Sequence, residues 1–188
     1  MQDSTKRLTV LSMLTALAFI LGAFIRLRGV FPAAPFLTFD IKDVGILIGG
    51  FLYGPFAALL MSVVLALVEM VTISDSGVLG AVMNTLASAS FACTAAFIYS
   101  KSRNFKGAVI GLFVGSLTAT AAMIGFNYFI IPLYMPGATR DAVAFMILPA
   151  LLPFNLIKTA VNSIIVLVIY KPVSKALRSI GFYKSLND

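Results

Sequence analysis

The stretch Leu148–Lys171, L-P-A-L-L-P-F-N-L-I-K-T-A-V-N-S-I-I-V-L-V-I-Y-K, places a charged side chain inside a segment otherwise suited to cross a membrane. Pro153 suits the first turn of a helix, and about 17 residues then follow, near the lower limit for crossing a bilayer. Asn155, Lys158 and Asn162 are spaced i, i+3, i+7 and share one helix face. A Lys in a span costs roughly 2.5–3.5 kcal/mol, so this face predicts a polar pocket. The alternative is that Lys158 snorkels to the interface.

The composition is that of a polytopic membrane protein. Of 188 residues, 60% are hydrophobic and 11% are charged, unlike any ordinary soluble domain. We therefore interpret the net charge of +7 as membrane topology and not as nucleic-acid binding. The single Cys93 excludes a disulfide framework, and the chain has no His, which is the commonest general base and metal ligand. No resident metal or cofactor is expected.

Hydropathy and turn residues divide the chain into six predicted transmembrane spans within one domain, residues 1–188. The spans lie at about 8–25, 42–53, 56–72, 77–100, 107–131 and 148–170. With the N-terminus inside, most loop Lys and Arg residues face the cytoplasm, as the positive-inside rule requires. The predicted fold is an all-α integral membrane bundle of six helices with both termini in the cytoplasm.

Small residues on the first span predict a surface that another helix can approach closely. Ser12 and Ala16 are four residues apart, as are Ala18 and Gly22, a spacing typical of helix contacts in membranes. The alternative is that small residues are simply frequent in membrane helices.

Two stretches, Arg26–Asp43 and Pro132–Asp141, are predicted to be irregular because they contain glycine and proline. The first is too apolar to lie free in water, so we expect it to fold back onto the bundle. Asp40 is predicted to cap the next helix. A plain connector at the membrane interface is the alternative.

Polar side chains gather in the outer halves of the spans, beside both irregular stretches. This placement predicts a polar pocket that opens to the outside. Asn84 is explained either by a helix–helix hydrogen bond or by a ligand contact. Glu69 either snorkels or pairs with a basic group such as Lys158 or Arg26. The polar residues assigned to the pocket are Asn84, Asn127, Asn155 and Lys158.

The pocket is predicted to bind a ligand and to perform no reaction. The chain has neither a P-loop nor a dinucleotide-binding glycine pattern, and no Ser has a His partner. Amide side chains offer a donor and an acceptor together, so they suit an imide-like edge on a flat apolar ligand. The alternatives are a small membrane enzyme that acts on a lipid headgroup through Glu69 and Lys158, and an accessory subunit without ligand.

A series of motifs runs along nearly the whole chain. They are K-R-L-T-V-L-S-M-L-T-A-L-A-F at 6–19, L-T-F-D-I-K-D-V at 37–44, Y-G-P at 53–55, F-N-Y at 126–128, P-L-Y at 132–134 and P-F-N-L-I-K at 153–158. In this order they resemble the riboflavin-specific substrate-binding (S) component of bacterial energy-coupling-factor (ECF) vitamin transporters. The resemblance implies a vitamin pocket near the outer face of the cell membrane and a gate loop between the first two helices. It also implies a transmembrane coupling subunit and two cytoplasmic ATPase subunits as partners.

The resemblance also assigns roles to residues. Riboflavin is the implied transported ligand, and ribityl hydroxyls suit an acceptor such as Asp40. Another vitamin is the alternative, since the fold class that the resemblance implies serves several. Arg26 and Arg28 at the pocket mouth raise flavin mononucleotide as a second ligand, because guanidinium groups bind phosphate; they are equally interpretable as lipid anchors. The implied flavin contacts are Asn127, Asn155 and Lys158, with Asn84 near the ligand. The implied gate-loop contacts are Leu37, Thr38, Phe39 and Asp40. The implied surface for the coupling subunit is Ser12, Ala16, Ala18 and Gly22.

Overall fold

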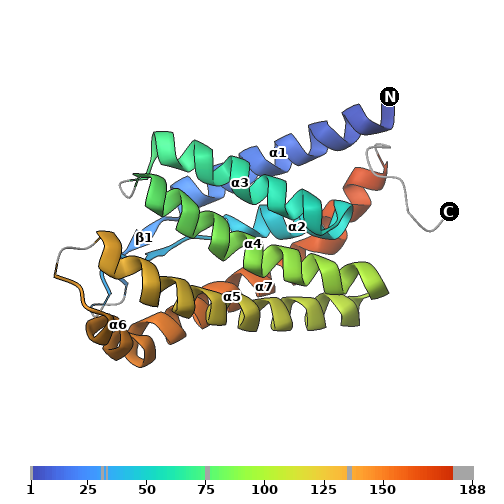
Figure 1. The fold of residues 1–188 in the computed structure, drawn as a ribbon. Helices are drawn as coiled ribbons and strands as arrows, with labels where there is room; N and C mark the ends of the chain where they lie inside the picture. Colours follow the sequence, from blue (N-terminus) through green and yellow to red (C-terminus); the bar gives the residue numbers. More distant parts are fainter. Residues whose placement is uncertain (1, 31, 33, 75–76, 135–136, 180–188) are drawn as a thin grey trace.

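The computed structural model is a bundle of long helices that run between two ends of the molecule (Figure 1). It describes residues 2–30, 32, 34–74, 77–134 and 137–179. The long helices are α1 (Gln2–Phe24), α3 (Pro55–Thr72), α4 (Gly77–Ser102), α5 (Phe105–Tyr134) and α7 (Leu152–Ser179). The short helix α2 (Asp43–Tyr53) lies among them.

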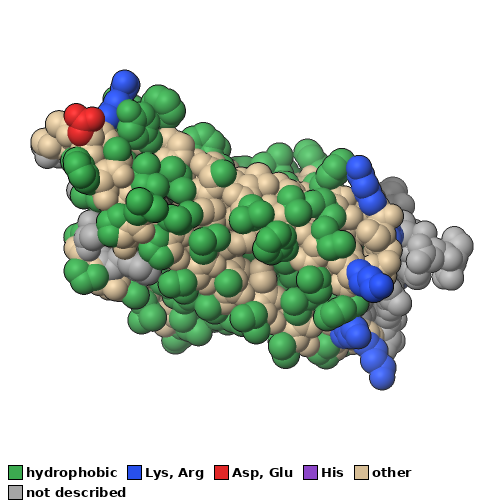
Figure 2. Space-filling model, turned by 90° about the horizontal axis from the view of Figure 1, so that it is seen from below, with side chains coloured by type: hydrophobic (Ala, Val, Ile, Leu, Met, Phe, Trp, Pro, Cys, Tyr) green, Lys and Arg blue, Asp and Glu red, His purple; other side chains and the backbone are tan. Residues whose placement is uncertain are grey.

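The predicted all-α membrane fold is confirmed. Within the described residues, five helical segments are long and apolar enough to cross a membrane, and α2 is a shorter apolar helix. Hydrophobic side chains cover the middle of the surface, whereas Lys and Arg gather at the end that carries the termini (Figure 2). This distribution matches a bundle whose middle faces lipid and whose termini lie in the cytoplasm.

Helix α2 is short because other helices surround it. Ten of its eleven residues are buried, and it packs against α1, α3, α4 and α7. Its glycines permit this close approach: a Cβ on Gly45 would lie 2.7 Å from the Cβ of Ala18, and one on Gly50 would lie 3.0 Å from Ala58. A helix that is hydrophobic all round is expected in such a position.

The segment between α1 and α2 folds back onto the bundle, as predicted. Strands β1 (Leu27–Arg28) and β2 (Thr38–Phe39) pair antiparallel, with Leu27 opposite Phe39 and Arg28 opposite Thr38. The predicted cap by Asp40 is wrong. The residue before α2 is Lys42, which makes no side-chain capping bond, and the Asp40 carboxylate bonds to a lysine instead.

The second predicted irregular stretch is shorter than expected. Pro132 lies inside α5, which continues to Tyr134; proline is tolerated in membrane helices because neighbouring groups compensate the lost hydrogen bond. After Gly137, helix α6 (Arg140–Met146) begins with a cap in which Thr139 accepts from the N–H of Ala142.

The last span also begins earlier than the sequence predicted. Helix α6 leads directly into a π-helical turn, η1 (Ile147–Leu151), and then into α7. Pro153 is therefore the second residue of α7 and not the start of an isolated helix. At its other end α7 continues past Tyr170, through Pro172, to Ser179. Residues 180–188 lie outside the described residues.

Candidate ligand-binding site

A cavity of about 140 Å³ is lined in part by Thr38 of β2. The strand β1, with which β2 pairs, lies at the end of the bundle opposite the termini (Figure 1). The walls of the cavity come from the C-terminal ends of α1, α3 and α5 and the N-terminal ends of α4 and α7. Apolar side chains cover part of it, among them Phe36, Met83, Met123 and Phe154. The rest of the lining is polar, and it includes most of the residues that the sequence assigned to the pocket.

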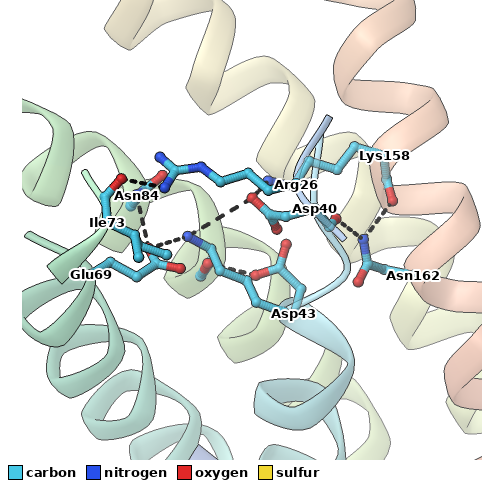
Figure 3. A network of polar contacts seen from close by, with 10 residues as sticks. Arg26, Asp40, Asp43, Glu69, Ile73, Asn84, Lys158 and Asn162 are labelled. Atoms are coloured by element: carbon cyan, nitrogen blue, oxygen red, sulfur yellow. Dashed lines mark hydrogen bonds and ion pairs between the residues drawn. The ribbon is translucent and has the colours of Figure 1, made fainter. Parts of the chain in front are cut away.

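A chain of charged groups crosses one side of the cavity (Figure 3). The Nζ of Lys158 lies 3.0 Å from Oδ2 of Asp40. That same carboxylate oxygen lies 4.0 Å from the Nζ of Lys42, which in turn donates to Oε2 of Glu69 at 2.5 Å. Asn84 completes the chain by donating to the same Glu69 oxygen at 3.0 Å. Basic and acidic groups thus alternate from α7 to α4.

These ion pairs and hydrogen bonds decide between the alternative roles that the sequence left open for Lys158, Glu69 and Asn84. The side chain of Lys158 is only 12% exposed and pairs with Asp40, so it turns into the bundle and does not snorkel. Glu69 pairs with Lys42, a partner that the sequence analysis did not consider. Asn84 makes a helix–helix hydrogen bond and also lines the cavity.

The carboxyl group of Asp40, in the loop before α2, stays ionised at neutral pH. Burial alone would raise its pKa, but the ammonium groups of Lys158 and Lys42 outweigh burial and lower the pKa. The backbone there is also held, because Asn162, which is fully buried, donates to the Asp40 carbonyl at 3.3 Å. The start of α2 is fixed too, since Ser88 donates to Oδ1 of Asp43 at 2.5 Å. The pocket floor is therefore tied to α4 and α7.

The amides of α5 and α7 present oxygen atoms to a ligand. Asn155 donates to the carbonyl of Leu151 at 2.7 Å, and Asn127 donates to the carbonyl of Met123 at 2.7 Å. Both side chains are buried and line the cavity. Because one N–H of each amide is bound to its own helix, the amide oxygens are the groups left to accept a hydrogen bond.

One acceptor at the site has no partner in the described part of the chain. The Oδ1 atom of Asp40 is buried without a hydrogen bond. A buried acceptor without a partner costs about 1–3 kcal/mol, and a ligand hydroxyl would remove that cost.

The gate-loop residues differ in whether they line the cavity. Leu37, Thr38 and Asp40 line the cavity, whereas Phe39 does not. Phe39 is opposite Leu27 in the register of β1 and β2, and its side chain is absent from the cavity lining. Its role as a ligand contact therefore stays a prediction.

The two mouth arginines also differ. Arg26 lines the cavity and donates to the carbonyl oxygen of Ile73, as Figure 3 shows. Arg28 is exposed on β1 and is not part of the lining.

The small residues of α1 likewise point in two directions. Ser12 and Ala16 are exposed and line a groove of about 490 Å³ between α1 and α3. Ala18 and Gly22 are buried inside the subunit, Ala18 against Gly45 and Gly22 against the side chain of Lys42. A partner cannot reach Ala18 and Gly22 in this structure, so these two residues do not fit the predicted docking surface, whereas Ser12 and Ala16 stay a prediction.

Lys42 is the site residue that sequence reasoning missed. It is 3% exposed and bridges the carboxylates of Asp40 and Glu69. The available signal was its position in D-I-K-D immediately before an apolar helix. A Lys so close to a buried helix requires a carboxylate partner, and Glu69 is one of few acids in the outer half.

Comparisons with known proteins agree with this geometry. Residues 6–170 match the family described as ECF transporter, substrate-specific component. The chain is 34% identical over 183 residues to the riboflavin transporter RibU of Staphylococcus aureus (strain TCH60), covering 95% of both chains. It is 31% identical over 174 residues to the riboflavin transporter FmnP of Bacillus subtilis (strain 168), covering 88% of this chain and 90% of that one.

A solved structure has the same fold. It is described as the S component of a bacterial ECF transporter, and it superposes with a TM-score of 0.76 at 35% identity, over 93% of this chain and 98% of the other. The alternative of a lipid-headgroup enzyme is set aside, because the family consists of transport subunits. The chain belongs to the ECF transporter substrate-specific components.

Proposed function

We propose that this subunit captures riboflavin at the outer face of a bacterial cell membrane and delivers it to the cytoplasm with an ATP-driven ECF module. The observation that carries the proposal is the buried cavity in which Lys158, Asn127 and Asn155 converge. The relatives described above as riboflavin transporters support the choice of vitamin.

The chemistry of the cavity suits a flavin. The isoalloxazine ring is flat and largely apolar, which fits walls such as Phe36 and Phe154. Its imide edge carries an N–H between two carbonyls: the amide oxygens can accept the N–H, and Lys158 can donate to a carbonyl. The ribityl hydroxyls can donate to the unpartnered oxygen of Asp40.

Charge balance favours the neutral vitamin over its phosphate ester. The basic and acidic side chains in and directly beneath the cavity are equal in number: Arg26, Lys42 and Lys158 against Asp40, Asp43 and Glu69. A site that neutralises itself offers no excess charge to a phosphate group. We therefore expect riboflavin to bind more tightly than flavin mononucleotide.

Binding requires the gate segment to move. The cavity holds about 140 Å³, below the roughly 300–1,000 Å³ of typical ligand pockets. The segment between α1 and α2 is held by side-chain bonds, chiefly Lys158 with Asp40 and Arg26 with Ile73. A ligand that takes over the hydrogen bonds of Lys158 would release that segment.

The partners in this proposal are a transmembrane coupling subunit and two cytoplasmic ATPase subunits. The groove between α1 and α3, with Ser12 and Ala16, is the surface proposed for the coupling subunit. Ala16→Phe should impair uptake in cells while leaving riboflavin binding by the purified subunit unchanged. Loss of binding in that variant would mean that Ala16 supports the fold and not the partner.

The direct test follows the fluorescence of the ligand, because the chain has no tryptophan. Purified protein should quench riboflavin emission saturably, at lower concentration than is needed for flavin mononucleotide. If folded protein does not quench riboflavin emission, the proposal is refuted.

A further inference from the structure

A second cavity, of about 340 Å³, lies at the opposite end of the bundle, near the cytoplasmic ends of α4, α5 and α7. It plays no part in the site described above. Its floor is aromatic: the rings of Phe51 and Tyr99 stack with centroids 4.4 Å apart, and Tyr170 packs edge-on against both at 5.6 Å. The hydroxyl groups of Tyr99 and Tyr170 are hydrogen-bonded to each other.

The rim of this cavity is basic. Arg103, Lys171 and Lys175 line it and are exposed. Within the described residues, none of the three forms an ion pair with a carboxylate. The local backbone fixes the placement of Arg103, because its N–H bonds to the carbonyl of Tyr99 at 2.8 Å with Arg103 in the left-handed region at φ 43°.

Two further features favour a negative charge here. Asn104 also lines the cavity and, through its side chain, accepts from the N–H of Gly107, which fixes the first turn of α5. The positive end of the dipole of this 30-residue helix therefore points toward the rim. The Tyr170 hydroxyl can accept from Tyr99 and still donate its own proton to an anion.

The surroundings indicate a ligand that is both anionic and apolar. Phe105, beside the rim, is 56% exposed, and Lys171 lies over its ring at 5.3 Å. Val168, one turn before Lys171 on α7, is 69% exposed. Apolar side chains facing lipid thus adjoin unneutralised cations at the membrane border, where basic pockets between helices bind anionic headgroups.

We infer that this cavity binds the phosphate group of an anionic phospholipid of the cytoplasmic leaflet. Arg103, Lys171 and Lys175 bind the phosphate, the Tyr170 hydroxyl donates to it, and the acyl chains lie along α5 and α7. The same chemistry would also recognise a soluble phosphate ester, so the experiment must separate the two sources.

The test uses the full chain in neutral detergent and follows tyrosine emission, which six tyrosines and no tryptophan provide. Dioleoyl phosphatidylglycerol in mixed micelles should change the emission saturably, whereas dioleoyl phosphatidylcholine should not. Sodium phosphate and glycerol 3-phosphate, added separately at constant ionic strength, form the soluble arm.

A matched pair of triple variants identifies the site. Arg103→Gln with Lys171→Gln and Lys175→Gln should weaken phosphatidylglycerol binding about 100-fold, since each basic group near a membrane surface contributes roughly fivefold. Lys6→Gln with Lys101→Gln and Lys106→Gln removes the same charge outside the cavity and should weaken binding at most a few-fold. The melting temperature without lipid checks that both variants fold.

The outcomes are distinct. A response to lipid that the first variant alone loses supports the inference. A response to the soluble phosphates with the same loss keeps the phosphate site and assigns it a soluble ligand. Equal losses in the two variants, or no response to either source, would overturn it.

Discussion

The two ends of the bundle use the same basic residues in opposite ways. At the outer end Lys42 is 3% exposed and Lys158 is nearly buried, and both are paired with carboxylates. At the cytoplasmic end Lys171 and Lys175 are exposed, and no described carboxylate pairs with them. Burial explains the difference. A buried charge requires a partner inside the protein, whereas an exposed charge is solvated by water and is free to bind an external anion.

This contrast assigns the selection of the transported ligand to the outer end and the attraction of anions to the inner end. The basic and acidic side chains of the outer cavity neutralise one another. Such a cavity favours a neutral ligand whose hydrogen bonds replace those that the side chains make with each other. An uncompensated inner rim attracts anions and, with the positive-inside rule, fixes the orientation of the chain. The predictions below test the contrast, beginning with the largest effect.

Removing the buried ammonium at the outer end should have the largest effect. Lys158→Met should weaken riboflavin binding about 100- to 1,000-fold, since truncating one partner of a buried charged pair costs roughly 2–5 kcal/mol. Asn155→Ala should also abolish tight binding without unfolding. Fluorescence titration measures both affinities.

A double variant separates binding from folding. Lys158→Met also leaves the buried Asp40 carboxylate without its nearest lysine partner, so it should lower the melting temperature. Adding Asp40→Asn should restore the stability but not the binding. Tight binding by either variant would show that the ligand lies elsewhere.

The second prediction compares one lysine from each end. Among the described residues, Lys42→Met leaves the buried Glu69 carboxylate with the Asn84 amide as its side-chain partner, which should cost about 3 kcal/mol of stability. Lys171→Gln is its matched control and should change stability by less than about 0.5 kcal/mol. Thermal unfolding of the two variants in the same detergent gives the comparison, and equal losses would remove the distinction between the ends.

The third prediction concerns a substitution that changes the charge balance of the outer cavity. Glu69→Gln adds one net positive charge, while Lys42 keeps Asp40 at 4.0 Å. One unit charge at about 10 Å contributes roughly 1.7 kcal/mol at an effective dielectric of 20, so the preference for riboflavin over flavin mononucleotide should fall roughly 20-fold. Competition titrations measure that ratio, and an unchanged ratio would mean that charge does not select the ligand.

The smallest effect is expected from pH. Because its lysine partners outweigh burial and lower the pKa of Asp40, its contribution to stability is fully present above the unfolded value near 4 and is lost only as pH falls through the lower folded value. The chain has no His. Melting temperature and riboflavin affinity should therefore stay nearly constant from pH 5 to 8, and a transition near pH 6.5 would contradict this assignment.

Periodicity and composition predicted the outer pocket well because they report on helices. The spacing of Asn155, Lys158 and Asn162 follows from 3.6 residues per turn, and all three meet Asp40 or the cavity. Whether Ala18 faces a partner or α2 depends on tertiary packing, which its four-residue spacing does not contain. The same holds for Lys42, whose partner Glu69 lies 27 residues away.

Phe39 shows a different limit. The motif resemblance covered a run of consecutive residues, and it does not say which of their side chains face the cavity. Leu37, Thr38 and Asp40 line it and Phe39 does not, a difference that depends on how the loop folds back onto the bundle.

The π-helical turn at Ile147–Leu151 sets the angular phase of the last helix. Each residue of an α-helix turns the next by about 100°, and a π turn accommodates one extra residue before the regular pitch resumes. Helix α6 (Arg140–Met146), η1 and α7 follow one another without a break. The π turn therefore sets which side of α7 faces the cavity independently of the orientation of α6. A different number of residues in this turn would place a different side of α7 against the cavity, so we expect an insertion or deletion here to change the cavity lining without replacing any residue of α7.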